Sequence, residues 1–136
     1  MANTMSLILR EEMYKILEGK DLWIMLLEGT STTPDDPTHD FVTDIVADEH
    51  AVATRKQLAN LTVERDDVNG RVEFHWDPVT WTALTGNATT FAVIFELVND
   101  DTDSPIQFVH ECAYTPTGVD LTVQPGSQGS VWSLAG

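Results

Sequence analysis

The sequence has few basic residues and a single cysteine. Its 136 residues include 7 Lys plus Arg against 22 Asp plus Glu, which gives a formal net charge of −15. Sequence-independent nucleic-acid binding depends on basic side chains that neutralise phosphates, so we expect no nucleic-acid partner. An anionic membrane surface is disfavoured for the same reason. One cysteine cannot form an internal disulfide, and we expect Cys112 to be a reduced thiol packed in a strand.

Long apolar runs and catalytic patterns are also missing. No stretch approaches the ~20 apolar residues of a membrane-spanning helix, and the N-terminus lacks the charged and apolar segments of a signal peptide. The four histidines are scattered, and no pair has the spacing of zinc ligands. No G-x-S-x-G motif occurs. We therefore expect no enzyme activity, no metal and no cofactor.

Two features imitate functional motifs. Asn99, Asp101 and Asp103 resemble the start of a calcium loop, but the glycine and the closing glutamate of that loop are missing at the required offsets. A polar hairpin turn is the better interpretation. The sequence also has four tryptophans, which we interpret as anchors in the core or at an interface rather than as a sugar-binding platform. They are Trp23, Trp76, Trp81 and Trp132.

What is present favours one folded domain. The length falls in the range of roughly 100–150 residues that is typical of a domain, and a hydrophobic content of 42% is too high for a disordered acidic tail. The charge is uneven, since all seven basic residues lie at or before Arg71 and eight acidic residues follow it. We interpret the acidic surface as one that favours solubility, with contact to a basic partner as the alternative.

An amphipathic helix is predicted over residues 5–17. Its apolar residues recur at three- and four-residue spacing, Ser6 or Thr4 suits the start as a cap, and Gly19 suits the end. The apolar set is Met5, Ile8, Leu9, Met13, Ile16 and Leu17. The simplest interpretation is a helix that covers one sheet face of its own domain. The alternative is an arm that docks on a neighbouring subunit.

The rest of the chain is predicted to be mainly β. Residues 41–47 fit helical spacing better than strand spacing, whereas residues 91–98 are apolar except for Glu96 and predict a central strand buried on both faces. The predicted strands are 22–27, 61–64, 72–76, 79–84, 91–98, 106–112, 121–123 and 131–134. On the strand 106–112, one face is expected to carry Ile106, Phe108, His110 and Cys112. Short strands at this spacing favour a sandwich or a barrel.

Several blocks of the sequence form a recognisable set: residues 5–20, 40–49 and 54–84, followed by 91–98, 104–106 and 118–123. These blocks resemble the small virion structural proteins of tailed bacteriophages, a group that includes capsid cement or decoration proteins. The resemblance implies an antiparallel β-sandwich of jelly-roll-like form with an N-terminal α-helix. Residues 1–20 would form the helix or arm, and residues 21–136 the sandwich of a single globular domain. It also implies a homo-oligomer, a dimer or trimer, located in the virion after assembly in the host cytoplasm.

The resemblance implies an adhesive function. A cement protein would bind the outside of the shell through the major capsid protein or other virion proteins, and would stabilise the assembled shell by mass action. The expected contact residues are the apolar side of the helix and the adjacent basic pair outside it: Met5, Ile8, Leu9, Met13, Ile16, Arg55 and Lys56. One alternative is a neck, tail or fibre-associated protein of the same particle. Another is a small carbohydrate-binding β-sandwich or an uncharacterised hydrolase.

Overall fold

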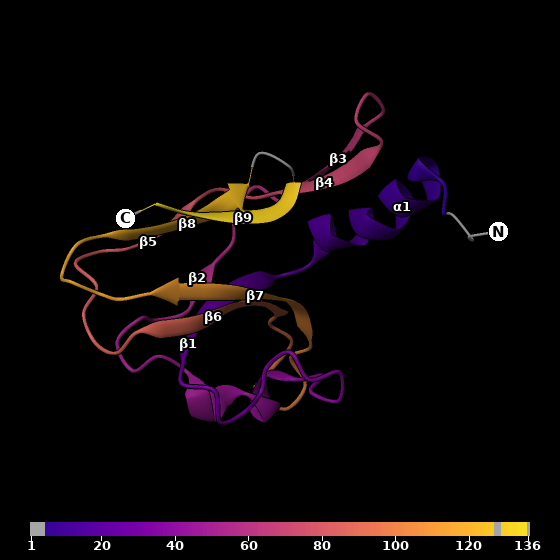
Figure 1. Cartoon of the computed structure of the whole chain (residues 1–136). Coiled ribbons are helices and arrows are strands. Elements are labelled where there is room, and N and C mark those ends of the chain that lie inside the picture. The colour runs from indigo at the N-terminus through magenta and orange to yellow at the C-terminus, as the bar shows by residue number, and fades with distance from the viewer. Residues whose placement is uncertain (1–4, 127–128, 136) are drawn as a thin grey trace.

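The fold is mainly antiparallel β-sheet with one N-terminal α-helix, as a computed structural model shows for residues 5–126 and 129–135 (Figure 1). Helix α1 (Leu7–Tyr14) continues into a 3₁₀ helix, η1 (Lys15–Gly19), and two short 3₁₀ helices, η2 (Val42–Asp44) and η3 (Val46–Asp48), follow later. The strands are β1 (Leu22–Glu28), β2 (Lys56–Gln57), β3 (Thr62–Asp66), β4 (Arg71–His75), β5 (Val79–Trp81), β6 (Thr89–Glu96), β7 (Ile106–Tyr114), β8 (Leu121–Gly126) and β9 (Gly129–Ala135). The predicted fold class is confirmed at this level.

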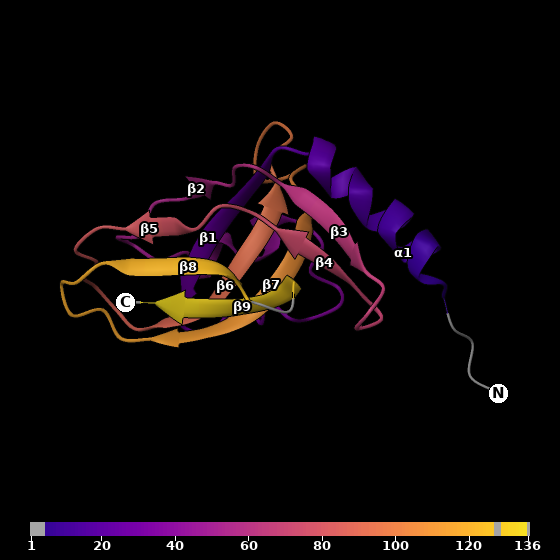
Figure 2. The same cartoon turned by 90° about the horizontal axis from the view of Figure 1, so that it is seen from above.

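The strands form three groups with antiparallel pairing. A four-stranded sheet has the order β2-β1-β6-β7, β3 and β4 form a hairpin, and a three-stranded sheet has the order β5-β8-β9. The three-stranded sheet lies over one face of the four-stranded sheet, so the body has two layers, as a β-sandwich does (Figure 1). Helix α1 and the hairpin project together from one end of this body (Figures 1 and 2).

The central strands β1 and β6 are apolar on both faces. In β6, Ala92 and Ile94 point into a first core, which lies against the hairpin and the three-stranded sheet. Val93 and Phe95 point into a second core on the opposite face. A strand that is covered on both faces needs consecutive apolar residues rather than alternating ones. The prediction of a doubly buried central strand is therefore confirmed for residues 91–96, whereas the strand ends at Glu96 and Val98 is 56% exposed.

A segment without a strand closes the second core. The predicted helical spacing of residues 41–47 corresponds to the two 3₁₀ turns η2 and η3. Val42 and Ile45 are fully buried there and belong to the same core as Phe95. A backbone hydrogen bond of 3.0 Å from Val42 N to Ser104 O ties the segment to the end of the acidic turn before β7. One face of the four-stranded sheet is thus covered by strands and the other by a folded loop.

Strand β7 does not alternate as predicted. The sequence pattern places Ile106 on the same face as Phe108 and Cys112, but Ile106 packs with the second core while the other two contact the first core. The cause is a register shift: Phe95 pairs with Ile106, the preceding residue of β6 pairs with Phe108, and Gln107 is an extra residue in β7. A β-bulge of this kind moves the residues before it to the opposite face of the sheet.

We predict that truncating the central strand costs far more stability than truncating the hairpin tip. The variant Ile94→Ala should lower the free energy of unfolding by about 2–5 kcal/mol, because apolar contacts are lost and a cavity remains. Val68 is 93% exposed at the tip between β3 and β4, so Val68→Ala should change it by no more than about 0.5 kcal/mol. Urea unfolding followed by tryptophan fluorescence measures both, and equal effects would contradict the central position of β6.

Candidate functional site

The N-terminal helix presents large apolar side chains to solvent. Ser6 caps α1 by accepting a hydrogen bond of 3.2 Å from Leu9 N. Five of the six side chains in the predicted apolar stripe are between 41% and 65% exposed. We call these five the arm face: Met5, Ile8, Leu9, Met13 and Ile16. Exposure of several large apolar side chains on one short element is typical of an interaction site.

The opposite side of the helix packs on the hairpin. Leu7 is half-buried and Leu17 is buried, and both contact the first core. Glu11 Oε1 lies 3.6 Å from Arg65 Nη1 of β3. The helix therefore lies against a hairpin of its own domain, but the apolar stripe does not cover it, since Leu17 is the one stripe residue that is buried and the other five are exposed. Helix α1 lies beside the β3-β4 hairpin at one end of the body (Figures 1 and 2).

A shallow groove continues the arm face toward the body. It has a volume of about 270 Å³ and lies between the end of the arm and the start of β7. Its mostly apolar lining comprises Met13, Tyr14, Ile16, Leu17, Gln107 and Phe108. Nothing in the sequence places Gln107 and Phe108 beside η1, because only the tertiary structure brings the two segments together.

Charge is unequally divided between the projecting part and the body. Residues 5–20 and 61–76, which contain the arm and the hairpin, carry five basic and seven acidic residues and have a net charge of −2. The remaining residues carry two basic and fifteen acidic residues and have a net charge of −13. The arm face therefore belongs to a nearly neutral projection on a strongly acidic body.

Arg55 is bound inside the chain. Its guanidinium donates hydrogen bonds of 2.7–3.1 Å to the carboxylates of Glu49 and Asp101 and lies 5.4 Å from the ring centroid of Phe95. The hydrogen bonds to these carboxylates raise the pKa of Arg55 above its ordinary value. The predicted role of Arg55 in binding a partner would require breaking this network. Lys56 lies half-buried in β2, at the edge of the four-stranded sheet.

Asp48 fixes the loop that follows β1. Burial alone would raise the pKa of Asp48, but hydrogen bonds from Ser31 and Thr32 outweigh it, and the pKa lies below its ordinary value. Ser31 Oγ donates at 2.6 Å, and Thr32 donates from its backbone N at 2.8 Å and from Oγ1 at 2.7 Å. This buried carboxylate has a structural role, since three donors of the same loop surround it.

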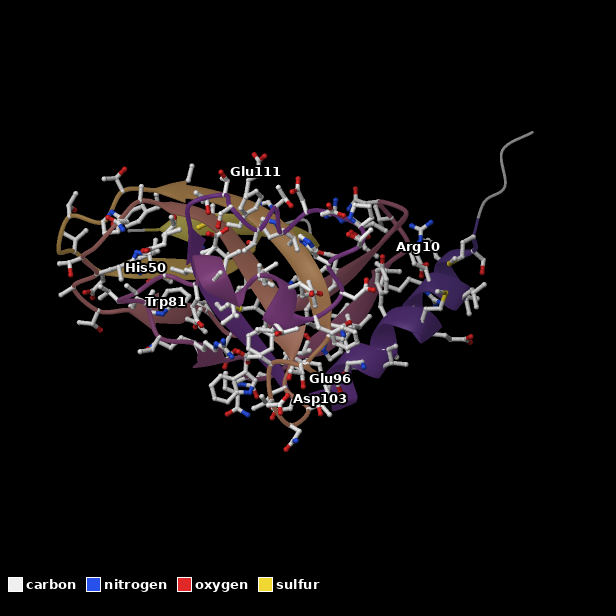
Figure 3. The ribbon with its side chains drawn as sticks, turned by 90° about the horizontal axis from the view of Figure 1, so that it is seen from below. Arg10, His50, Trp81, Glu96, Asp103 and Glu111 are labelled. Atoms are coloured by element: carbon white, nitrogen blue, oxygen red, sulfur yellow. The ribbon has the colours of Figure 1, made fainter. Side chains whose placement is uncertain are left out.

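His50 lines a cavity of about 360 Å³ formed by residues 49–54. Its Nδ1 accepts hydrogen bonds from Val52 N at 3.2 Å and Ala53 N at 3.0 Å, so Nε2 is the donor to Asn87 O at 2.8 Å. Both ring nitrogens therefore hold the backbone of this loop. His50 and Trp81 lie at the end of the molecule opposite to Arg10 of α1 (Figure 3).

The acidic turn before β7 is held by its own carboxylates. Asp103 Oδ1 accepts hydrogen bonds from Asn99 N at 3.1 Å and Asp100 N at 2.9 Å. Asp100 Oδ1 accepts one of 2.8 Å from Thr102 N, and Asp101 binds Arg55. These bonds agree with the prediction of a polar turn. Within residues 5–126 and 129–135, there is no group of three or more His, Cys, Asp or Glu side chains that could hold a metal ion.

The tryptophans with described side chains occupy structural positions. Trp76 and Trp81 are buried in the first core, and Trp81 Nε1 donates a hydrogen bond of 2.6 Å to Thr54 O. Trp23 is half-buried against the second core. The side chain of Trp132 lies outside the described part of the structure. The described tryptophans thus match the predicted anchors in the core.

Comparisons with family models, with curated proteins and with solved structures gave no match to this chain. In the part of the chain that the structure describes, no helix is long and apolar enough to cross a membrane. The functional interpretation therefore rests on the residues of the chain itself. Among the described residues, the arm face supplies five of the eleven exposed large apolar side chains, and these five lie close together in the sequence.

We predict that Asp48 makes the folded state sensitive to acid. Because its pKa is lowered from an ordinary value of about 3.8, its stabilisation is complete above that pH and is lost as the pH falls through the lower folded value. Asp48→Asn should reduce stability at pH 7 by about 1–3 kcal/mol and should lose less stability than the unaltered protein on acidification from pH 5 to pH 2.5. Asp35→Asn, at an exposed carboxylate of the same loop, is the control. Parallel pH profiles for Asp48→Asn and the unaltered protein in urea unfolding would refute the assignment.

We predict that Arg55 contributes to stability and that its neighbour does not. Arg55→Met should lower the free energy of unfolding by about 1–2 kcal/mol, because it leaves two partly buried carboxylates without their cation. Lys56→Met removes the same charge and should change stability by about 0.5 kcal/mol or less. Thermal and urea unfolding measure both variants. An equal loss in both would show that net charge, rather than the network, is responsible.

Proposed function

We propose that this chain is a structural protein of a tailed-bacteriophage virion, a capsid decoration protein that binds the outside of the shell and stabilises it. The observation that carries the proposal is the arm face, an apolar surface that projects from an acidic β domain whose own cores are closed. A protein with this distribution is suited to adhesion, because it offers a contact surface without exposing its core.

The resemblance to phage virion proteins covers the same parts of the molecule. Residues 5–20 form the arm, residues 40–49 cover the second core, and residues 54–84 include the hairpin. We propose that the two layers are a jelly-roll-like sandwich, which the antiparallel pairing supports. Such a body suits a particle component, since it is rigid and is built around a sheet buried on both faces.

The charge favours the exterior of the particle. An interior filled with DNA presents dense phosphate charge, which repels a chain of net charge −15. On the outer surface this repulsion is absent. A protein that binds only the assembled shell stabilises it by mass action, in proportion to its concentration relative to the dissociation constant.

The carbohydrate-binding alternative has less support. A sugar platform requires exposed aromatic rings, whereas Trp76 and Trp81 are at most 4% exposed in the first core. The two buried positions instead stabilise the domain. A protein at the neck or tail of the virion would use the same adhesive chemistry. The number of copies per particle distinguishes that position from a decoration protein on the shell.

We predict that intact virions of the phage that encodes this chain contain it on the order of hundreds of copies, comparable with the major capsid protein, because a decoration protein follows the symmetry of the shell. Quantitative gel densitometry of purified particles measures this number. Protease added to intact particles should cleave the chain if it lies outside. About a dozen copies or fewer would place it at the neck or tail, and its absence from particles would refute the proposal.

A further inference from the structure

We infer that Asn69, at the tip of the β3-β4 hairpin, is a site of spontaneous covalent modification, in which its carboxamide is released as ammonia and an acidic residue remains. The reaction needs only water, so the inference does not depend on the proposed function. Three observations carry it: Gly70 follows Asn69 in the chain, the tip is exposed, and the carboxylate of Asp66 holds the Asn69 side chain.

Asn69 has the sequence neighbour that favours this reaction. The chain contains five asparagines, and a glycine follows only this one. Asparagine is a chemically labile side chain, and it reacts with the backbone nitrogen of the next residue, whose Cβ would crowd the approach. Gly70 has no Cβ, and an atom built at that position would meet nothing within 4 Å apart from its chain neighbours. The surroundings of the attacking nitrogen are therefore open.

The tip has the exposure and the freedom that the reaction needs. Residues 67–70 connect β3 to β4, all four are exposed, and Val68 is 93% exposed. None of the four belongs to either core, and the tip lies at the outer end of the hairpin, away from both larger sheets (Figures 1 and 2). Turns that contribute nothing to a core open locally at a small cost in free energy.

Asp66 restrains the reactive side chain. Asn69 donates a hydrogen bond of 2.7 Å from Nδ2 to Asp66 Oδ2 and one of 3.1 Å from its backbone N to Asp66 Oδ1. These hydrogen bonds hold the pKa of Asp66 below its ordinary value, so the carboxylate is ionised at neutral pH. The bond from Nδ2 directs the carboxamide toward Asp66, whereas the reaction requires it to turn toward Gly70 N. Asp66 therefore slows the modification.

The reaction balances with water as its only co-reactant. Gly70 N loses its proton to solvent and attacks Asn69 Cγ, so a C–N bond forms. The bond between Cγ and Nδ2 breaks, and the released nitrogen takes up a proton and leaves as ammonia, which gives a succinimide ring. Water then opens the ring at one of its two carbonyl groups. Opening at Cγ leaves an aspartate, and opening at the main-chain carbonyl leaves an isoaspartate, in which the backbone runs through the side chain.

The product removes a bond that holds the tip. The side chain of an aspartate or isoaspartate has no N–H group, so the donor to Asp66 is replaced by a second carboxylate that faces the first. Two like charges at this distance repel each other. An isoaspartate also lengthens the backbone beside Gly70, which closes the turn with a φ of 66°. The modification thus adds negative charge to the nearly neutral projection and loosens its outer end.

The test is peptide mapping by mass spectrometry, after the full chain has been kept at mildly alkaline pH. Asn69 should convert to a mixture of aspartate and isoaspartate, while the asparagines without a following glycine stay unaltered over the same interval. Those asparagines are Asn3, Asn60, Asn87 and Asn99. Conversion should be faster at higher pH, because the attacking nitrogen must lose a proton.

Two variants test the restraint by Asp66. Asp66→Ala should raise the rate of conversion about tenfold, since one hydrogen bond to a charged group changes a population by about this factor. Asp67→Ala is the matched control, because it removes the same charge from the same turn, where Asp67 pairs with Arg65 at 3.0 Å and leaves the Asn69 bonds in place. It should leave the rate unchanged. In urea-unfolded chains the unaltered protein and both variants should convert at equal rates, which separates the lost bond from a general loss of folding.

Three results would overturn the inference. The first is an Asn69 that stays unaltered in the folded chain while the unfolded chain converts, because the fold would then protect this residue completely. The second is faster conversion of an asparagine elsewhere. The third is an equal acceleration by Asp66→Ala and Asp67→Ala, which would assign the rate to the charge of the tip rather than to the hydrogen bond. None of these results bears on the number of copies in virions, so the proposed function is tested separately.

Discussion

The structure depends on the burial of one sheet on both faces. Strands β1 and β6 supply consecutive apolar side chains, such as Met25 and Leu26, that point to opposite cores. Each face then requires a cover, and the chain provides two different ones: a second sheet with a hairpin on one side, and the 3₁₀ segment on the other. The hydrogen-bond networks of Asp48 and Arg55 serve the cover of the second core. Asp48 and Arg55 hold in place the loops that close the second core, where strand pairing is replaced by side-chain hydrogen bonds.

The sequence predicts the features whose cause is local. The consecutive apolar residues of β6 and the polar turn that contains Asp103 need no knowledge of distant segments, and both are found. Features that depend on a partner segment are missed. The bulge that moves Ile106 to the other face depends on β6. The predicted strand 79–84 ends at Trp81 because Ala83 adopts a positive φ of 48° and donates its backbone N–H to a side chain before β8. In both places a tertiary contact overrides the local pattern.

In the candidate site, too, the sequence predicts what is local and misses what depends on distant segments. Helical spacing identifies the apolar residues of the arm, but spacing cannot tell a stripe buried in its own domain from one left for a partner. The structure separates these cases, since Leu17 alone of the stripe is buried. Sequence adjacency of Arg55 and Lys56 suggests a basic contact, whereas the fold gives Arg55 two carboxylates of its own. The adhesion that we propose would therefore use an apolar, nearly neutral surface of a strongly acidic molecule.

The pairing of β1 with β6 has a consequence for the synthesis of the chain. The two strands are 61–74 residues apart, so at about 5–20 residues per second β1 leaves the ribosome roughly 3–15 s before its partner. During that interval Leu22 to Leu27, six apolar residues without a charge, lack the strand that covers them. The β3-β4 hairpin needs only a short connection and forms sooner. Nascent β1, more than the arm, is then the segment most exposed to aggregation and to capture by chaperones.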